Sequence, residues 1–197
     1  MERRAIIKRK TSETDIIAEV DIDSSLDSVI DTGVPFLDHM LHSMSRHGRF
    51  YLNIKCSGDT EIDDHHSVED AGICIGKAIK EALGTKEGIK RFGYAIIPMD
   101  ESLTLAAVDM SGRAYFKYTG KELKGSINTY SEELTLEFLR SMAMSAEMNL
   151  HIEQRYGDNR HHIHESIFKA LGVSLYQAFS IDENLMGKVL STKGTIV

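Results

Sequence analysis

The chain has few residues of several types, and its few cysteines and short apolar runs exclude some classes of protein. Tryptophan does not occur in its 197 residues, proline occurs twice, and cysteine occurs only at Cys56 and Cys74. Two cysteines are too few for a disulfide framework, so we expect a reducing, cytoplasmic location. Unbroken apolar runs are short, which excludes a transmembrane helix and predicts no membrane association. Residues 1–8 include no long apolar stretch, so we expect no secretory signal.

The balance of charge is acidic, with a formal net charge of −7. This charge argues against nucleic acid as the main partner, although a local basic patch could still bind a phosphate. Hydrophobic residues make up 42% of the chain, enough for a folded core of one domain or two small ones. Histidine is the unusual component, because nine occur and most of them are clustered.

The chain contains an internal repeat. A His-His-x-x-Glu motif begins at His65 and again at His161, 96 residues later, and each copy opens an apolar-periodic stretch typical of an amphipathic helix. Gly84 is expected to end the first of these helices. Upstream, residues 39–44 align with residues 137–142, and each of these segments lies in a second predicted helix, over about 34–48 and 132–147.

Strand-like segments surround these helices. Alternating or β-branched runs predict strands at 5–9, 14–22 and 50–56 in the first half, and at 94–97, 103–109, 114–118 and 148–156 in the second. Residues 57–64 and 119–129 are polar and contain glycine, so we expect loops there. The chain therefore predicts an α+β fold of two β-β-α-β-α half-domains, each with helices on one face of a sheet. The half-domains span 1–90 and 91–185, and a tail follows over 186–197.

The repeated motif is suited to metal binding. On a helix, positions i and i+4 share a face, so each Glu converges with a His of its own pair, whereas adjacent histidines diverge by about 100°. An adjacent pair is therefore better placed to serve two metals than one. Imidazole and carboxylate together suit Mn, Fe, Co, Ni or Zn. One copy alone would be a weak signal, since polar helix starts often look like this, but two equivalent copies favour a metal site.

Eight residues form the candidate ligand set, four from each half: His39, His65, His66, Glu69, Glu137, His161, His162 and Glu165. Shared by two metals, they supply four ligands to each, and octahedral coordination then leaves two open positions. Open positions are typical of a catalytic rather than a structural metal.

Other features carry less information. The chain has no glycine-rich phosphate loop, no Gly-x-Ser-x-Gly elbow and no His-Glu-x-x-His motif. The tail sequence Ser191-Thr192-Lys193-Gly194 could grip a phosphate, but a terminal segment of this kind is more often a frayed end. His42, His47 and His164 are expected to be ordinary hydrogen-bonded side chains. Four methionines are expected to fill the core: Met44, Met142, Met144 and Met148.

Several long motifs resemble those of the imidazoleglycerol-phosphate dehydratase family. They are DTGVPFLDHML at 31–41, DDHHSVED at 63–70, IPMDE at 97–101, HHIHESIFKA at 161–170 and the tail at 191–194. The resemblance covers essentially the whole chain. It implies duplicated half-domains of the ribosomal protein S5 domain 2-like class, each with a four-stranded sheet. It also implies a homo-oligomer of 24 subunits with active sites at subunit contacts.

The resemblance also implies an activity. Members dehydrate D-erythro-imidazole glycerol phosphate to imidazole acetol phosphate and water, the sixth step of L-histidine biosynthesis, with two Mn²⁺ ions per active site. The metal ligands map onto the eight residues above, although position 137 is His in part of the family and Glu here. Substrate contacts map onto seven positions: Glu13, His47, Arg91, Arg113, Lys169, Ser191 and Lys193. The chain lacks the histidinol-phosphatase domain of some relatives, so we expect a single activity.

The substrate has no carbonyl to acidify the C–H bond that breaks. The expected mechanism therefore binds its imidazole to the di-manganese site as imidazolate, which acts as the electron sink, and passes through a diazafulvene-like intermediate. Glu13 is the candidate acid/base on the side away from the metals. Arg91, Arg113, Ser191 and Lys193 are expected to hold the phosphate.

Three alternatives remain open from the residues alone. A two-metal phosphohydrolase would use the same residue types and would release inorganic phosphate instead of a keto product. A metal-storage or metal-sensing protein would need neither Glu13 nor Lys193. An RNA-binding β-α module is disfavoured by the acidic charge.

Overall fold

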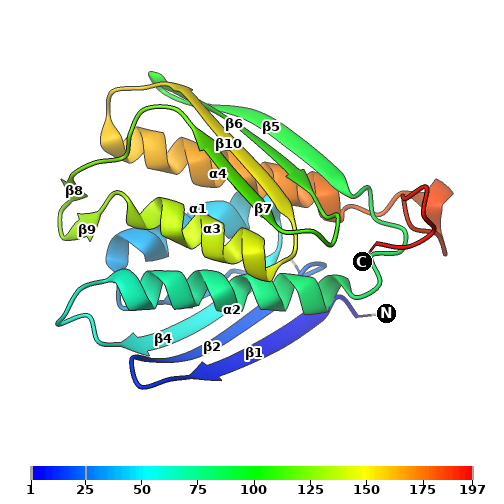
Figure 1. Ribbon diagram of the computed structural model, residues 1–197, viewed down its shortest axis with the longest axis horizontal. Coiled ribbons are helices and arrows are strands. Elements are labelled where there is room, and N and C mark those ends of the chain that lie inside the picture. Colours follow the sequence, from blue (N-terminus) through cyan, green and yellow to red (C-terminus); the bar gives the residue numbers. More distant parts are fainter. Residues whose placement is uncertain (1, 25, 197) are drawn as a thin grey trace.

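The computed structural model describes residues 2–24 and 26–196, so Met1, Ser25 and Val197, which fall in the expected first half-domain and tail, lie outside the described residues. Figure 1 shows two similar halves in chain order. The first half comprises β1 (Arg4–Lys10), β2 (Thr14–Asp21), β3 (Val29–Asp31), α1 (Pro35–Gly48), β4 (Tyr51–Gly58) and α2 (His65–Leu83). The second comprises β5 (Phe92–Met99), β6 (Ser102–Asp109), β7 (Tyr115–Thr119), β8 (Ser126–Ile127), β9 (Tyr130–Ser131), α3 (Leu134–Ser145), β10 (Asn149–Tyr156), α4 (Arg160–Phe179) and a final 3₁₀ turn, η1 (Glu183–Leu185).

Each half contains a four-stranded mixed sheet, with the order β1-β2-β4-β3 in the first and β5-β6-β10-β7 in the second. In both sheets the first two strands form an antiparallel hairpin, and the strand after the first helix pairs antiparallel with the second strand. It pairs in parallel with the short third strand on its other side. The expectation of a duplicated α+β fold with four-stranded sheets is confirmed.

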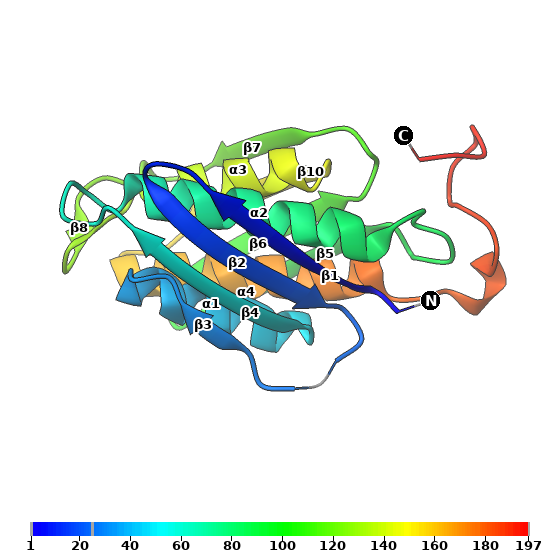
Figure 2. The same ribbon diagram turned by 90° about the horizontal axis from the view of Figure 1, so that it is seen from below.

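The four helices lie between the two sheets, as Figures 1 and 2 show. The inner face of each sheet is apolar, because buried residues alternate with exposed ones along strands such as β2 and β6. Helix α2 packs on β1 and β2, and α4 packs on β5 and β6. Between the sheets α1 contacts α4 and α2 contacts α3, so both halves contribute to one continuous core.

Glycine sets the distance between these helix pairs. A Cβ added at Gly76 of α2 would lie 2.5 Å from the backbone oxygen of Met142 in α3. A Cβ at Gly172 of α4 would lie 2.4 Å from the backbone oxygen of Met44 in α1. Gly76 and Gly172 occupy equivalent positions in the repeat, as do Met44 and Met142. The duplication therefore extends to the backbone contacts that join one half to the other.

The structure differs from the sequence-based expectation in a few places. Strand β3 was not predicted, because three residues are too few to show an alternating pattern. The predicted loop at 119–129 contains β8, which forms a small hairpin with β9. Three of the four methionines expected in the core are fully buried, but the prediction for Met144 is wrong, since it is 51% exposed. Helix α2 ends before Gly84, as predicted.

Among the described residues, no helix is both long and apolar enough to cross a membrane. The helices that approach the necessary length, α2 and α4, carry charged residues and begin with the His pairs.

The close approach at Gly76 predicts a specific sensitivity. Gly76→Ala should lower stability although alanine favours helix, because the new methyl group meets the backbone of Met142 rather than a movable side chain. We expect a loss of about 1–3 kcal/mol and a fall in Tm of about 2–4 °C per kcal/mol. Lys77→Ala, at the exposed neighbouring position of α2, is the matched control and should leave Tm nearly unchanged. Equal Tm values for the two variants in thermal denaturation would contradict this packing argument.

Candidate active site

A group of possible metal ligands forms where the two halves meet. His39 of α1, His161 and Glu165 of α4 each offer a donor atom, and all three atoms lie within 4.8 Å of one another. The His161 Nε2 and Glu165 Oε2 atoms are 3.3 Å apart, because their i, i+4 spacing puts them on one helix face. The ring centroids of His39 and His161 are 5.2 Å apart. The packing of α1 against α4 therefore joins ligands from both halves of the chain.

Lys169 lies beside this cluster. Its Nζ is 2.8 Å from Glu165 Oε1 and 3.3 Å from Met99 Sδ. Burial opposes ionisation of Glu165, but the hydrogen bond and charge of Lys169 outweigh burial and lower the pKa of the Glu165 carboxyl below its usual value. Glu165 is therefore held as a carboxylate, the form that binds metals.

The residues equivalent to this cluster, which are Glu137, His65 and Glu69, lie farther from one another. His65 Nε2 and Glu69 Oε2 of α2 are 3.7 Å apart. The Glu137 carboxylate on α3 lies 3.3 Å from Arg140 on its own helix. Within the part of the chain that the structure describes, Glu137 does not complete a three-donor cluster with His65 and Glu69.

The second histidine of each pair points elsewhere, as helical geometry requires. The rings of His65 and His66 are at 90° to each other, and those of His161 and His162 are at 87°. His66 and His162 each face loop carboxylates instead of the cluster described above. Among the described residues, neither ring belongs to a three-donor group of the kind that His39, His161 and Glu165 form.

Two carboxylates contact these rings, and neither belongs to the predicted ligand set. Asp59 lies 3.1 Å from His66 Nδ1 and raises the pKa of that imidazole. Glu101 lies 2.7 Å from His162 Nδ1 and likewise raises the pKa of His162. The pKa of Glu101 falls to about 2, through the bond to His162 and then that from the Asn159 amide. Sequence reasoning missed both roles, although Glu101 lies in a quoted motif and Asp59 in the loop before His65.

Glu13, the candidate acid/base, lies in the turn between β1 and β2. Its Oε1 is 3.8 Å from His66 Nε2, and its side chain is half exposed. It therefore shares one end of the fold with the His pairs, although it is distant from most of them in sequence.

His164 is the buried histidine of this region. It is fully buried, its Nδ1 is 2.8 Å from the Thr135 hydroxyl, and Tyr130 contacts the same hydroxyl at 2.9 Å. Burial lowers the pKa of His164 to about 4, so it is a neutral core residue at physiological pH. The sequence-based interpretation of His164 as a hydrogen-bonded structural residue agrees with this environment.

The four residues assigned to the phosphate line one cavity of about 560 Å³: Arg91, Arg113, Ser191 and Lys193. Arg91 donates to the Leu190 carbonyl at 2.6 Å and forms a bidentate pair with Asp109 at 2.7 and 3.1 Å. Arg91 thereby joins the start of the tail, at Leu190, to the body of the fold.

This cavity and the second His pair, His161 and His162, lie at opposite ends of α4. The Arg91 amide bonds to the Ala178 carbonyl in the last turn of α4, whereas His162 lies in its first turn. Sixteen residues at 1.5 Å each separate these positions by about 24 Å. Figure 1 shows the C-terminal segment at the end where α2 and α4 finish. A small substrate cannot reach both regions of one chain.

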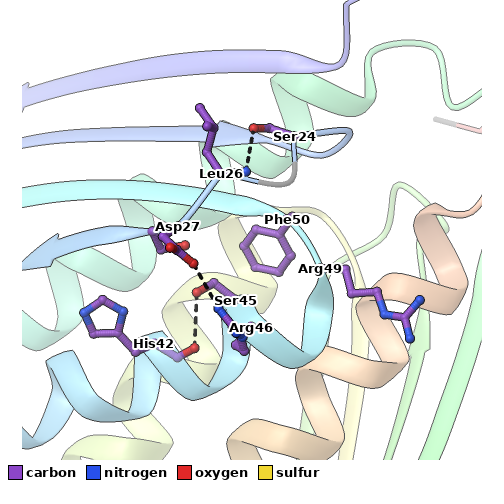
Figure 3. Close-up of a pocket in the computed structure, with 9 residues that line it drawn as sticks. Ser24, Leu26, Asp27, His42, Ser45, Arg46, Arg49 and Phe50 are labelled. Atoms are coloured by element: carbon purple, nitrogen blue, oxygen red, sulfur yellow. Dashed lines mark hydrogen bonds and ion pairs between the residues drawn. The ribbon is translucent and has the colours of Figure 1, made fainter.

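Two other features lie apart from these clusters. His47 Nδ1 donates to the backbone carbonyl oxygen of Ser43 in its own helix, 2.8 Å away, and among the described residues it forms no hydrogen bond with the other predicted substrate residues. A cavity of about 600 Å³ lies between the end of α1 and residues 26–28, with Ser24 also in its lining (Figure 3). Its Arg46 is paired with Asp27 at 2.9 Å. Its described lining contains none of the predicted site residues.

Comparison with known proteins agrees with the fold. Residues 32–175 match the family Imidazoleglycerol-phosphate dehydratase. Proteins of that name from Leptospira biflexa and a Geobacillus species are 50% and 49% identical to this chain, over the full length of both partners. The crystal structure of the Staphylococcus aureus enzyme has a TM-score of 0.82 at 36% identity and covers 91% of this chain and 99% of its own. The Pyrococcus furiosus structure has the same TM-score and identity, covering 96% and 99%.

The fold, the imidazole and carboxylate clusters and these matches define the protein as a carbon–oxygen hydro-lyase, an enzyme that eliminates water. More narrowly, the chain belongs to the imidazoleglycerol-phosphate dehydratase family of histidine biosynthesis.

Proposed function

We propose that this chain converts D-erythro-imidazole glycerol phosphate to imidazole acetol phosphate and water, the sixth step of L-histidine biosynthesis. The observation that carries the proposal is the His39, His161 and Glu165 cluster, which two helices from different halves bring together within 4.8 Å. Family membership supports the reaction class, and the cluster supplies donors suited to the metal chemistry that the reaction needs.

The eight predicted ligands would hold two Mn²⁺ ions. Imidazole and carboxylate are appropriate donors, and Glu165 is held ionised by Lys169. When bound, the two ions supply Lewis acidity and a docking point for the substrate imidazole as imidazolate. Glu137 can serve in place of the His found in part of the family, because carboxylate is also an acceptable Mn²⁺ ligand once it leaves Arg140.

The other residues of the chain bind, orient and move protons. Glu13 is half exposed and adjacent to His66, so its carboxylate can reach a substrate at that end of the fold, accept a proton from it and, as the carboxylic acid, return a proton. The guanidinium groups of Arg91 and Arg113, with Ser191 and Lys193, offer donors to a phosphate in the tail cavity. Phosphate binding there would orient the reacting carbon from a distance. His47 and Lys169 remain proposed substrate contacts.

The distance between the two regions supports a site shared among subunits. His162 and the tail cavity are about 24 Å apart along α4, so the phosphate grip of one chain would complete the metal-binding end of another. The number of 24 subunits is what the family resemblance implies, and we propose it on that ground.

The surface of the chain also favours assembly. Phe92, Tyr94 and Ile96 project from the outer face of β5, and Tyr94 is 70% exposed. Large apolar side chains grouped in this way mark contact surfaces. The proposed location is a reducing cytoplasm, since Cys56 and Cys74 are both free and buried.

The central test is turnover by the full-length protein. Metal-stripped protein should be inactive on imidazole glycerol phosphate, and added Mn²⁺ should restore formation of a keto product without release of inorganic phosphate. Elemental analysis should find about two ions per chain, consistent with eight ligands in two sets of four. Released phosphate would instead indicate a phosphohydrolase, and metal binding without turnover would indicate a storage protein.

Glu13→Gln separates binding from proton transfer. This variant keeps the shape of the side chain but removes its titrating proton, so kcat should fall by about 10²–10⁴-fold while substrate binding and metal content persist. Glu61→Gln, an exposed position in a nearby loop, is the control. Near-normal kcat in Glu13→Gln would remove Glu13 from the mechanism, and weaker binding with normal kcat would make it a positioning residue.

Lys193→Ala tests the tail cavity. Loss of one charge-assisted contact to the phosphate typically costs about 1.5–3 kcal/mol, so KM should rise roughly ten- to a hundred-fold with metal content unchanged. Lys188→Ala removes an exposed lysine outside the cavity lining and should leave KM unaltered. Identical KM values for the two variants would show that the tail does not grip the substrate.

A further inference from the structure

Two equivalent histidines are each held at the same ring atom by a carboxylate. His66 of α2 and His162 of α4 are both the second histidine of their motif, 96 residues apart. The Nδ1 of His66 lies 3.1 Å from Asp59, and the Nδ1 of His162 lies 2.7 Å from Glu101. In both cases Nε2, the other ring nitrogen, is left facing away from this contact.

Asp59 is held in position by the backbone. Its amide donates to the Glu13 carbonyl at 3.2 Å, and its own carbonyl accepts from Ile62 at 2.9 Å. Both carboxylate oxygens are 3.1 Å from His66 Nδ1 and within hydrogen-bonding distance of it. The loop after β4 is therefore folded so that this carboxylate faces the ring.

Glu101 is fixed by its first oxygen and contacts His162 with its second. Oε1 accepts from the amide of Asn159 at 2.8 Å and that of Asp158 at 3.3 Å, at the start of α4. Oε2 then lies 2.7 Å from His162 Nδ1. The turn between β5 and β6 is thereby joined to the first turn of the helix that carries the histidine.

The two carboxylates come from positions that are not equivalent in the repeat. Asp59 follows β4, whereas Glu101 immediately precedes β6. The residue that immediately precedes β2 in the first half is Glu13, and it faces the opposite nitrogen of His66, Nε2, at 3.8 Å. The same contact is thus made twice by different parts of the backbone, which duplication alone does not explain.

We propose that Asp59 and Glu101 are positioning residues that orient His66 and His162 for metal binding. A neutral imidazole that donates its Nδ1 hydrogen to a carboxylate carries its lone pair on Nε2, so the acid fixes both the tautomer and the ring direction. The inference rests on the proposed function, because it requires that His66 and His162 bind metal through Nε2. It adds two acidic residues to the site, neither of them a metal ligand.

The test measures Mn²⁺ binding by the metal-stripped full-length protein, using titration calorimetry. Asp59→Ala and Glu101→Ala should weaken Mn²⁺ binding by about 10- to 100-fold, the usual effect of losing a carboxylate behind a histidine ligand. Asp59→Asn should recover most of the affinity, because its amide oxygen still accepts from Nδ1. The Tm of metal-free Asp59→Ala and Asp59→Asn should match, since orientation of a partly exposed ring adds little to folding.

Glu61→Ala and Asp158→Ala are the matched controls. Glu61 lies in the loop that carries Asp59, and Asp158 lies in the loop before α4 with its side chain beside Lys121. Each variant removes one exposed carboxylate that contacts neither ring, and leaves the backbone amides in place, so each should bind Mn²⁺ like the unmodified chain. Unaltered Mn²⁺ affinity in both Asp59→Ala and Glu101→Ala would overturn the inference. So would an Asp59→Asn variant as weak as Asp59→Ala, which would indicate a general effect of charge.

His66→Ala and His162→Ala separate this inference from the function on which it rests. If these variants lose Mn²⁺ while Asp59→Ala and Glu101→Ala retain full affinity, only the positioning role is wrong. If both histidine variants retain full Mn²⁺ occupancy, the ligand assignment fails and the positioning role fails with it.

Discussion

The close approach of helices from opposite halves is the constraint on which the rest of the structure depends. Gly76 and Gly172 let α2 lie against the backbone of α3 and α4 against the backbone of α1, with no room for a side chain. These contacts bury the apolar faces of both sheets in one core. The contact at Gly172 also sets the distance between α1 and α4. His39 of α1 therefore lies close to His161 of α4.

The two halves resemble each other more in their backbone fold than in the side-chain clusters that they form. Both halves have the same strand order and equivalent helix contacts, yet only one of the two equivalent ligand sets is assembled among the described residues. His39 contributes to a three-donor cluster, whereas its counterpart, Glu137, is paired with Arg140. A duplicated scaffold can therefore preserve the positions of ligands while neighbouring side chains decide which of them are gathered in one chain.

Much of the fold could be predicted from the sequence, because amphipathic helices and alternating strands leave a local pattern. The helices starting at the His pairs, the stop before Gly84 and the duplicated α+β plan all come from that pattern. Strand β3 could not be predicted in this way, since it is a strand only through its parallel pairing with β4. Met144 was placed wrongly because its residue type favours burial, whereas its position on α3 faces outward.

For the site, the sequence by itself determined the residue types and the helix faces that carry them. Spacing of four residues is enough to pair His161 with Glu165, because both lie on one turn of one helix. Only the tertiary structure decided which groups meet across elements: His39 with His161, Asp59 with His66, Glu101 with His162, and Arg91 with the tail. It also placed the tail cavity and the second His pair at opposite ends of α4. The physical reason is that helical periodicity acts over a few residues, whereas contacts between distant segments depend on how whole elements pack.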